Sequence, residues 1–476
     1  MAEKQGHLDR LSPVDASFLH QERRVSHMHV GALVIFDGPP PSRDDFVEHI
    51  ESRLHLVPRY RQKLAFPRFG MGRPVWVDDP CFNLEYHVRH TALPRPGSFE
   101  QLRKLTGRIY SQRLDRSKPL WETWLVQGLE DNRFALITKT HHSMIDGISG
   151  VDLASVLFDL EPVPRHVEPE PWTPQPLPSG AELIADGVRD AVRAPLGLAQ
   201  RAAGAIQSPG RALRNAREAA EGIGEVLWAG LNPAPQLPLN VPIGPHRRIE
   251  RVVAQLSDLK TIKAELGGTV NDVVLAVVAG ALRSWLRSRG VRTEGLELRG
   301  LVPVSIRAED EHGELGNRIA AMRGPLPVYV DDPVERLRVV TEAMAGIKES
   351  KQALGAEVIA GLTGFAPPTI LAQASRLNFS TRLFNLIVTN VPGPQFPLYL
   401  LGRELQEVVP LAFLPEDHAM AVAIMSYNGI VDFGLLGDFD AMPDLDFVAD
   451  AIDESLRELL AAATGEPAES PAPARA

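Results

Sequence analysis

The chain has a single cysteine among its 476 residues. One cysteine cannot form a disulfide within the chain, so the sequence predicts a fold without covalent cross-links and fits a reducing cytoplasm. Cys81 directly follows two aspartates and a proline, and neighbouring acids disfavour the thiolate that a nucleophile needs. We therefore expect Cys81 to be a small buried or half-buried residue without a chemical role.

Long apolar runs and an excess of positive charge are also missing. The longest apolar run, Val273–Leu282, is shorter than the roughly 20 residues that a helix needs to span a bilayer. Met1–Asp15 contains no apolar stretch, so we expect no signal peptide. With 50 Lys and Arg against 60 Asp and Glu, the formal net charge is −10, which disfavours nucleic acid as a partner. Any contact with a membrane is then expected to be peripheral.

The most informative stretch is 141–147, which reads His-His-Ser-Met-Ile-Asp-Gly. Residues 134–140, before it, alternate apolar and polar and predict a strand, whereas 148–160, after it, have apolar residues at helical spacing. The motif is therefore expected on a strand-to-helix turn, which Gly147 allows to be tight. Because neighbouring residues of a strand point to opposite faces, the two histidines are not expected to hold one metal ion, and a metal hydrolase is disfavoured.

The two histidines offer a base for proton transfer. A neutral imidazole suits the removal of a hydroxyl proton near pH 7. One ring can face a cavity while the other packs behind it. The alternative is an ordinary histidine pair at a strand end, followed by an aspartate that caps a helix. Ser143 could be a nucleophile, but no G-x-S-x-G elbow surrounds it.

The distribution of proline divides the chain. We predict an N-terminal half at 1–161 that carries the histidine motif, a proline-rich linker with crossover helices at 162–239, a C-terminal half at 240–463 and a disordered tail at 464–476. Within the linker, 182–231 is rich in Ala, Arg and Leu. It is expected to form two helices that lie on the body of the protein, with contact to lipid as the alternative.

Shorter motifs follow one another along the chain. They are Leu-Ser-Pro-x-Asp from residue 11, Met-His-Val-Gly from 28, Pro-Leu-Trp-Glu from 119, Asn-Asp at 271–272, Val-Pro-Val-Ser-x-Arg from 302 and Asn-Val-Pro-Gly-Pro from 390. Each is weak alone. Together with H-H-x-x-x-D-G, and in this order, they make the chain resemble the bacterial wax ester synthase/diacylglycerol acyltransferase family. That family belongs to the chloramphenicol acetyltransferase-like, coenzyme A-dependent acyltransferases, which also include peptide-synthetase condensation domains.

The resemblance implies a fold and an activity. The fold is α/β, with two chloramphenicol acetyltransferase-like halves, each a mixed sheet flanked by helices, and a tunnel between them. The activity is transfer of a long-chain fatty acyl group from acyl-CoA to the hydroxyl of diacylglycerol, with a long-chain alcohol as a second acceptor in wax ester synthesis. No cofactor is implied, because acyl-CoA is a substrate. The implied location is the cytoplasm, with peripheral contact to the inner membrane face or to lipid inclusions and droplets.

The resemblance also assigns roles within the motif. His142 corresponds to the general base and His141 to a supporting residue. Asp146 is mainly structural and orients the site by pairing with an arginine, and Gly147 forms the turn. No metal ligand is implied.

Two further residues are candidates for a supporting or substrate-binding role. Arg307 ends the strand predicted at 298–306, and we take it as the partner of Asp146, with an exposed arginine as the alternative. Asn271 lies in the first turn of the helix predicted at 270–289, where backbone N–H groups favour anions. It could bind the thioester oxygen or only hold the helix start.

Two other functions remain open. One is a condensation-type acyltransferase whose donor is attached to a carrier protein, and a carrier-protein partner would identify it. The other is a non-catalytic lipid-droplet binding protein, which would bind lipid without turnover.

Overall fold

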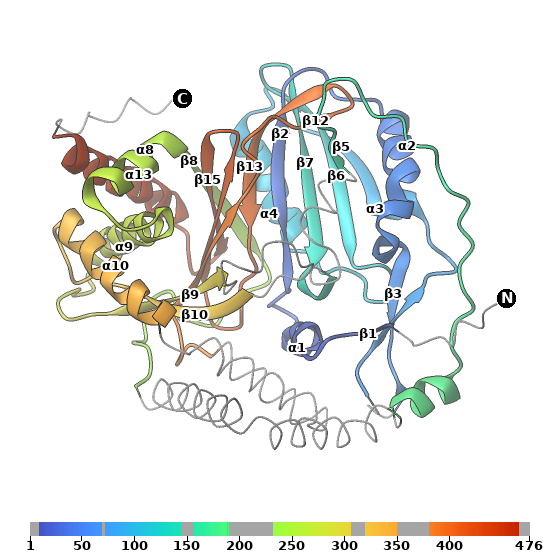
Figure 1. Cartoon of the computed structure of the whole chain (residues 1–476), viewed down its shortest axis with the longest axis horizontal. Helices are drawn as coiled ribbons and strands as arrows, with labels where there is room; N and C mark the ends of the chain where they lie inside the picture. Colours follow the sequence, from blue (N-terminus) through green and yellow to red (C-terminus); the bar gives the residue numbers. More distant parts are fainter. Residues whose placement is uncertain are drawn as a thin grey trace, which may run out of the picture.

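The computed structural model describes residues 9–68, 72–144, 157–187, 189, 232–305, 319–349 and 380–465. Two six-stranded sheets stand next to each other and carry helices on their outer sides (Figure 1). This is the α/β architecture of two mixed sheets flanked by helices that the sequence predicts. The tunnel between the halves stays a prediction.

The first sheet has the strand order β12-β13-β2-β7-β6-β5. Its strands from the first half of the chain are β2 (His29–Phe36), β5 (Val88–Ala92), β6 (Trp121–Leu129) and β7 (Arg133–His141). The strand predicted before the histidine motif is confirmed as β7, which forms an antiparallel hairpin with β6. Its turn residues Asp131 and Asn132 have φ angles of 60° and 54°, as tight hairpin turns require.

Helices cover both faces of the first sheet. α2 (Arg43–Arg53) packs on the face that carries Phe36 and Phe134, and α4 (Phe99–Tyr110) packs on the opposite face. α4 begins with a capping box, in which the hydroxyl of Ser98 and the side chain of Gln101 each satisfy a backbone N–H group of the other. Smaller elements complete this half: α1 (Pro13–Gln21), α3 (Leu84–His87), β1 (Asp9–Arg10), β3 (Gln62–Ala65) and β4 (Val75–Asp78).

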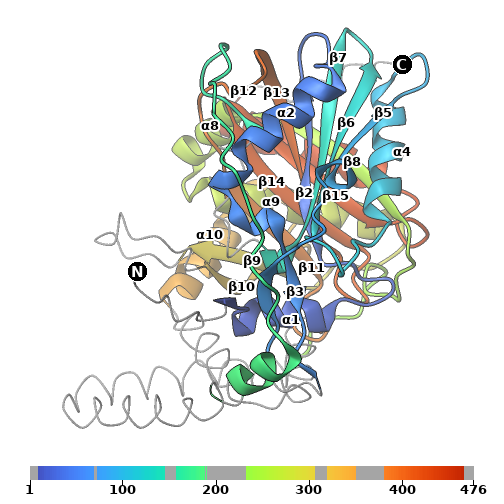
Figure 2. The same cartoon turned by 90° about the vertical axis from the view of Figure 1, so that its right-hand side faces the viewer.

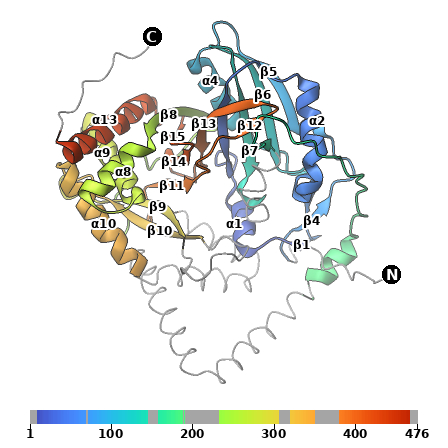
Figure 3. The same ribbon diagram turned by 45° about the horizontal axis from the view of Figure 1, so that its top comes forward.

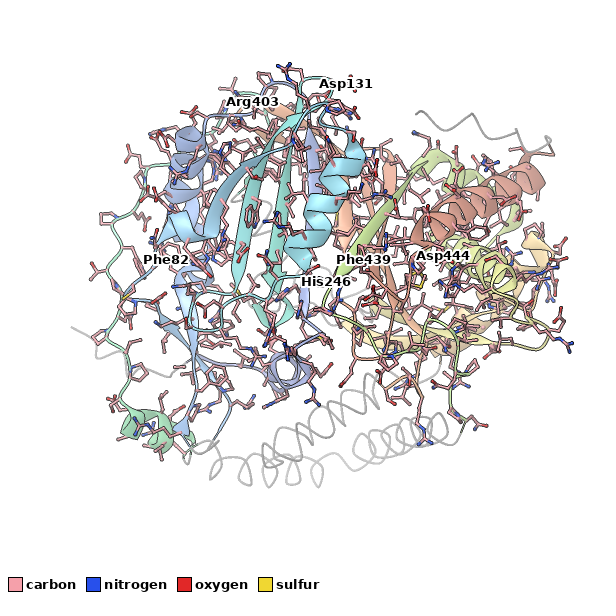
Figure 4. The ribbon with its side chains drawn as sticks, turned by 180° about the vertical axis from the view of Figure 1, so that it is seen from behind. Phe82, Asp131, His246, Arg403, Phe439 and Asp444 are labelled. Atoms are coloured by element: carbon pink, nitrogen blue, oxygen red, sulfur yellow. The ribbon has the colours of Figure 1, made fainter. Side chains whose placement is uncertain are left out.

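Two strands of the first sheet come from the second half of the chain. β13 (Arg403–Leu411) pairs antiparallel with β2, and β12 (Tyr399–Leu400) pairs with β13. This segment lies inside 240–463, the range that the sequence assigned to the C-terminal half. Figure 4 places Arg403, at the start of β13, at the same end of the molecule as Asp131 in the β6–β7 turn. The later segment therefore crosses over and completes the sheet of the earlier half.

The second sheet has the strand order β10-β9-β11-β14-β15-β8. Its strands are β8 (Arg247–Gln255), β9 (Leu298–Ser305), β10 (Ile319–Leu326), β11 (Leu386–Pro392), β14 (Met420–Tyr427) and β15 (Ile430–Asp438). β14 and β15 form a hairpin whose turn is Asn428-Gly429, a strong turn signal in the sequence, with φ angles of 44° and 85°.

The helices of the second half are α8 (Leu256–Leu266), α9 (Val270–Ser288), α10 (Pro333–Glu349) and α13 (Leu445–Thr464). They group on the outer side of the second sheet (Figure 3). α9 starts with a capping box between Thr269 and Asp272, and most of its residues are buried. Thr464 still belongs to α13, so the predicted tail starts too early, and the tail from residue 466 onward lies outside the described residues.

The two halves share one hydrophobic core. Leu33 and Ile137 of the first sheet belong to the same buried cluster as Val274 of α9 and Phe433 of β15. The backbones come very close at the seam, because a Cβ atom on Gly434 of β15 would overlap a backbone oxygen of β13. Only glycine allows that approach, so the seam is built for direct contact between the sheets.

The described segment from residue 157 onward runs over the outside of the first half, past α2, to a short helix (Figure 2). Residues 145–156 lie outside the described part, and Leu157 is helical. The predicted helix end at 160 is wrong, because Asp159 instead exchanges two backbone hydrogen bonds with Tyr399, of 2.8 and 2.9 Å. Residues 162–179 form neither helix nor strand, as expected of the proline-rich linker.

A helix covers 180–187, but almost all of the predicted crossover helices lie outside the described residues. The stretch 57–63 reads as a basic turn in the sequence, and a solvated loop is the expectation for its arginines. That expectation is wrong, because Arg61 is buried with its guanidinium over the ring of Trp172, and Arg59 lies over Trp76. Aromatic faces attract these cations and remove them from water.

Candidate active site

The histidine pair lies where β7 ends. β7 stops at His141, and a 3-10 turn, η4 (His142–Met144), follows. The backbone N–H of His141 donates to Leu120 O at 2.9 Å, and that of His142 donates to Met28 O at 2.8 Å. The segments that lead into the neighbouring strands β6 and β2 therefore hold the turn from both sides.

The ring of His142 packs between two phenyl rings. Phe18 of α1 is stacked on it, with ring centroids 3.9 Å apart and an interplanar angle of 27°. Phe413, just after β13, meets it edge-on at 5.5 Å and 86°. Figure 3 shows α1 close to the end of β7. Burial lowers the pKa of the half-buried His142 to about 4, so the imidazole is neutral near pH 7.

His141 packs behind the turn and is buried. The backbone N–H of Ser143 donates to its Nδ1 at 3.1 Å, so Nδ1 is the acceptor and the ring proton lies on Nε2. Nε2 lies 3.8 Å from Oε2 of Glu22. Burial, followed by the charge of Arg116, holds the pKa of His141 well below its usual value. His141 is thus a neutral residue fixed in one tautomer.

Glu22 is a residue that the sequence did not single out. It caps the C-terminus of α1, and its carboxylate is buried. Its Oε1 accepts from Nε of Arg113 at 3.3 Å, and its Oε2 accepts from Nε of Arg116 at 2.5 Å. An acid just beyond a short helix carries no motif, and only the fold reveals that its carboxylate faces His141.

A polar layer continues behind the histidines. His29 of β2 lies opposite His141, with ring centroids 6.1 Å apart. Lys139 is completely buried and donates from Nζ to Ile109 O and to Gln112 O, both at 3.1 Å. Burial, and then the charge of Lys139, hold the pKa of His29 well below its usual value, and burial lowers the pKa of Lys139 itself.

Neither candidate nucleophile is well placed. The hydroxyl of Ser143 is buried and lies 2.7 Å from Nδ1 of His141. Cys81 is exposed, which corrects the expectation of a half-buried side chain, because it lies in a surface turn whose N–H donates to Asp79. Across the described residues, no group of three or more His, Cys, Asp and Glu side chains could hold a metal ion.

Three of the six predicted site residues are described. His141 and His142 come together at the end of β7, whereas Asn271 lies in the second half at the start of α9. The Oδ1 of Asn271 accepts from Nδ2 of Asn390, on β11, at 3.4 Å. Asp146, Gly147 and Arg307 lie outside the described residues, so the pairing of Asp146 with Arg307 stays a prediction.

Two family descriptions match the chain. The wax ester synthase/diacylglycerol acyltransferase catalytic domain matches residues 11–274, and the C-terminal domain of the same family matches 315–460. The chain belongs to this family. It is an acyltransferase, and the family's catalytic domain includes the histidine turn, Phe18 and Glu22.

Curated relatives and solved structures agree with this assignment. A probable diacylglycerol O-acyltransferase of Mycobacterium tuberculosis is 32% identical over 466 residues, which cover 95% of this chain and 96% of the relative. A second probable diacylglycerol O-acyltransferase from that organism is 33% identical over 467 residues, which cover 95% of this chain and 99% of the relative. The wax ester synthase/diacylglycerol acyltransferase from Marinobacter aquaeolei VT8 superposes with a TM-score of 0.69 at 27% identity, covering 96% of this chain and 100% of that one.

A more distant structure shares the fold alone. The first condensation domain of the calcium-dependent antibiotic synthetase superposes with a TM-score of 0.60 at 15% identity, covering 98% of this acyltransferase and 99% of that chain. The common fold is the two-lobed chloramphenicol acetyltransferase-like architecture that the sequence motifs predict.

The chain of the acyltransferase is anchored again shortly after the histidine turn. The buried Arg53 of α2 donates to Oδ1 of Asp159 at 2.8 Å and to Arg165 O at 3.0 Å. His49, one helical turn earlier, lies 3.0 Å from Leu157 O through its Nε2. These contacts fix the point at which the segment after the motif rejoins the described fold.

Proposed function

We propose that this acyltransferase moves a long-chain acyl group from acyl-CoA to the free hydroxyl of diacylglycerol, with His142 as the general base and without a resident cofactor. The observation that carries the proposal is the neutral imidazole held between Phe18 and Phe413 at the end of β7. The names of the relatives from Mycobacterium tuberculosis support diacylglycerol as the acceptor.

The reaction balances with one histidine. His142 takes the proton of the acceptor hydroxyl while the oxygen attacks the thioester carbonyl carbon. A carbon–oxygen bond forms, and the carbonyl electron pair becomes an oxyanion. When the oxyanion collapses, the carbon–sulfur bond breaks, and the imidazolium returns its proton to the thiolate. A thiol pKa of about 8.5, taken from cysteine, makes that thiolate a good leaving group.

Burial of His142 has two consequences for this mechanism. The neutral form needed to accept a proton is the resting form, because the pKa is about 4. The imidazolium is costly in the resting site, but the oxyanion that forms beside it offsets that cost, since opposite charges attract strongly where water is excluded. Protonation of His142 is therefore favoured only while the acceptor is reacting.

A direct transfer is the route that the described residues support. Ser143 already shares its hydroxyl with His141, and Cys81 is an exposed turn residue. A covalent acyl-enzyme would need a nucleophile that is both accessible and next to a base. Ser143 lies next to His141 but is buried, and the exposed thiol of Cys81 makes no hydrogen bond to a histidine among the described residues.

The acceptor implies contact with lipid. Diacylglycerol with long chains is nearly insoluble in water, so we propose that the enzyme collects it at the surface of a membrane or a lipid inclusion in the cytoplasm. In the described part of the chain, no single helix has the length and apolar composition to cross a bilayer. The bent pair α8 and α9 meets these criteria only jointly, with a 99° angle between them, and most of α9 is buried in the core.

A product analysis tests the proposal. Purified protein is incubated with palmitoyl-CoA and either a diacylglycerol or hexadecanol in mixed micelles. The lipid products are separated, and the amount of ester is compared with the amount of free coenzyme A released. We expect triacylglycerol, and a wax ester with hexadecanol if the alcohol is a second acceptor. His142→Ala should lower the rate by about 10²–10⁴-fold while the circular dichroism spectrum stays unchanged.

Two outcomes would contradict the proposal. If a folded His142→Ala variant forms triacylglycerol at the wild-type rate, His142 is not the base. If the wild type forms no ester from acyl-CoA with either acceptor but accepts an acyl group from a carrier protein, the donor is wrong and the condensation-type alternative holds.

A further inference from the structure

Helix α1 contacts both histidines of the turn from one side. Phe18 stacks on His142, and Glu22, one helical turn later, faces His141. Phe18 is itself in edge-on contact with Phe413, at 5.9 Å and 79°, so the three rings form a closed group. α1 is thus packed against the part of the chain where the chemistry is proposed.

The buried histidines that the structure describes each have at least one hydrogen bond at the ring. His418 has Nδ1 at 2.8 Å from Glu416 O and Nε2 at 3.2 Å from Phe384 O. His142 differs, because no hydrogen bond joins its ring to another described residue, and its buried Nδ1 has no partner among them. Within the described part of the chain, the contacts that orient this ring are therefore the two phenyl rings.

The packing around His142 is suited to that task. A stacked phenyl at 3.9 Å leaves no room for the imidazole to turn about its Cβ–Cγ bond, and the edge-on ring of Phe413 blocks the second direction. An aliphatic side chain of similar volume would fill the space, but it has no flat face to define the plane of the imidazole. General-base catalysis depends on that plane, because the accepting nitrogen must point at the hydroxyl proton.

We propose that Phe18 is a positioning residue for the acyl transfer, which sets the plane of the His142 ring by stacking and keeps water from one of its faces. This inference rests on the proposed function of His142 as the base. It assigns to α1 a role in the reaction in addition to its packing in the hydrophobic core.

Three variants separate positioning from packing. Phe18→Leu keeps apolar volume but removes the flat ring, and Phe18→Tyr restores it. Phe384→Leu is the matched control, because Phe384 stacks on His418 at 4.5 Å and 26°, in the second half of the molecule. Each variant is assayed with palmitoyl-CoA and diacylglycerol, and its melting temperature is measured.

We expect Phe18→Leu to lower kcat by about 10- to 100-fold, as a misaligned catalytic group does, with KM nearly unchanged. Phe18→Tyr should recover most of kcat. Phe384→Leu should lower the melting temperature by a similar amount while kcat stays at the wild-type value. A folded Phe18→Leu variant with wild-type kcat would overturn the proposal, as would equal losses of kcat in Phe18→Leu and Phe384→Leu.

A second measurement does not depend on turnover. Titration of ¹⁵N-labelled histidines by NMR, with His142 assigned through His142→Ala, follows the ring directly. We expect the pKa of His142 to rise in Phe18→Leu, because water reaches the exposed face, and to stay unchanged in Phe384→Leu. An unchanged titration of His142 in Phe18→Leu would refute the positioning role. Absence of ester formation by the wild type would instead count against the proposed function, whatever the titration shows.

Discussion

The pKa of about 4 for His142 predicts that kcat/KM tolerates mild acid as long as the protein stays folded. The perturbation is a fall in pH from 8 to 5.5. At pH 5.5 an imidazole with a pKa of about 4 is about 97% neutral, whereas one with the ordinary value of 6.5 is only about 9% neutral. Because kcat/KM reports the ionisation of the free enzyme, it should stay near its plateau at pH 5.5 instead of falling about tenfold.

Acid also changes the free energy of unfolding, and the assay has to separate this change from the ionisation of His142. Burial, and then the charge of Arg53, lower the pKa of His49 to about 4 from 6.5, so the folded state binds fewer protons than the unfolded state. The stability that neutral His49 contributes is fully present above pH 6.5. It is lost as the pH falls towards 4, which lowers the free energy of unfolding by about 3 kcal/mol. For Asp432 the sign is opposite, because burial raises its pKa to about 6, and its destabilising effect above pH 6 is relieved by acid.

The net effect of acid on folding should be unfavourable. Burial also lowers the pKa of five other histidines: His27, His29, His87, His141 and His418. Each adds to the loss of stability below pH 6.5, and a typical domain has only about 5–15 kcal/mol in total. The assay therefore measures initial rates between pH 5 and 8, with circular dichroism at each pH to show that the protein is folded.

A fall of kcat/KM at the ordinary histidine pKa would refute the buried state of His142. If kcat/KM falls with a midpoint near pH 6.5 while the protein is folded, the His142 ring is solvated, and the ring packing seen around it does not exist in the free enzyme. A fall in rate that coincides with unfolding would not bear on His142, so only points where the spectrum is native are used.

Two further predictions concern stability. Asp159→Asn leaves the buried Arg53 without its anion and should lower the free energy of unfolding by about 3–5 kcal/mol, whereas Asp453→Asn, in a partly exposed pair, should cost less than about 1 kcal/mol. Equal losses in urea unfolding would show that the buried pair is not special. Gly434→Ala should destabilise by about 1–3 kcal/mol or more, because its Cβ overlaps a backbone oxygen of β13, whereas Gly346→Ala, in an open part of α10, should stabilise by about 0.5–1 kcal/mol. Unfolding midpoints that move in the same direction would contradict this account of the seam.

Elements with strong local signals could be predicted from the sequence. α1 begins with Ser12 as its N-cap and Pro13 in the first position, a start that these two residues signal in the sequence. The hairpin at Asn428-Gly429 could be predicted because these residues readily adopt positive φ angles. In each case a few neighbouring residues determine the backbone, so no knowledge of distant contacts is needed.

Elements that depend on distant contacts were missed. β13 has a bulge between Leu405 and Glu407, which breaks the alternation that identifies a strand, and its partner β2 lies near the other end of the chain. α8 starts without a side-chain cap, and its buried residues are Leu259 and Ile262. Two apolar positions are too few for the helical periodicity to be recognised in the sequence. Both elements are stabilised by contacts with distant parts of the chain and not by their local sequence.

The candidate site shows the same division. His142 could be found because H-H-x-x-x-D-G is a compact pattern, but its surroundings carry no pattern at all. Phe18 comes from α1, near the start of the chain, and Phe413 comes from the segment after β13, near the end. A stacked ring requires only an aromatic residue at the right place in space, which a single sequence does not specify.

The origin of these two rings argues that neither half of the chain makes the site alone. Phe413 reaches His142 because β13 pairs with β2, and β13 in turn packs against β15 at a glycine. The turn that holds the proposed base is thus covered by a strand that the second half of the chain adds to the first sheet. We therefore expect a change in how the two sheets meet at Gly434 to reach the His142 ring through Phe413. On this account the proposed base depends on the contact between the sheets as well as on its own turn.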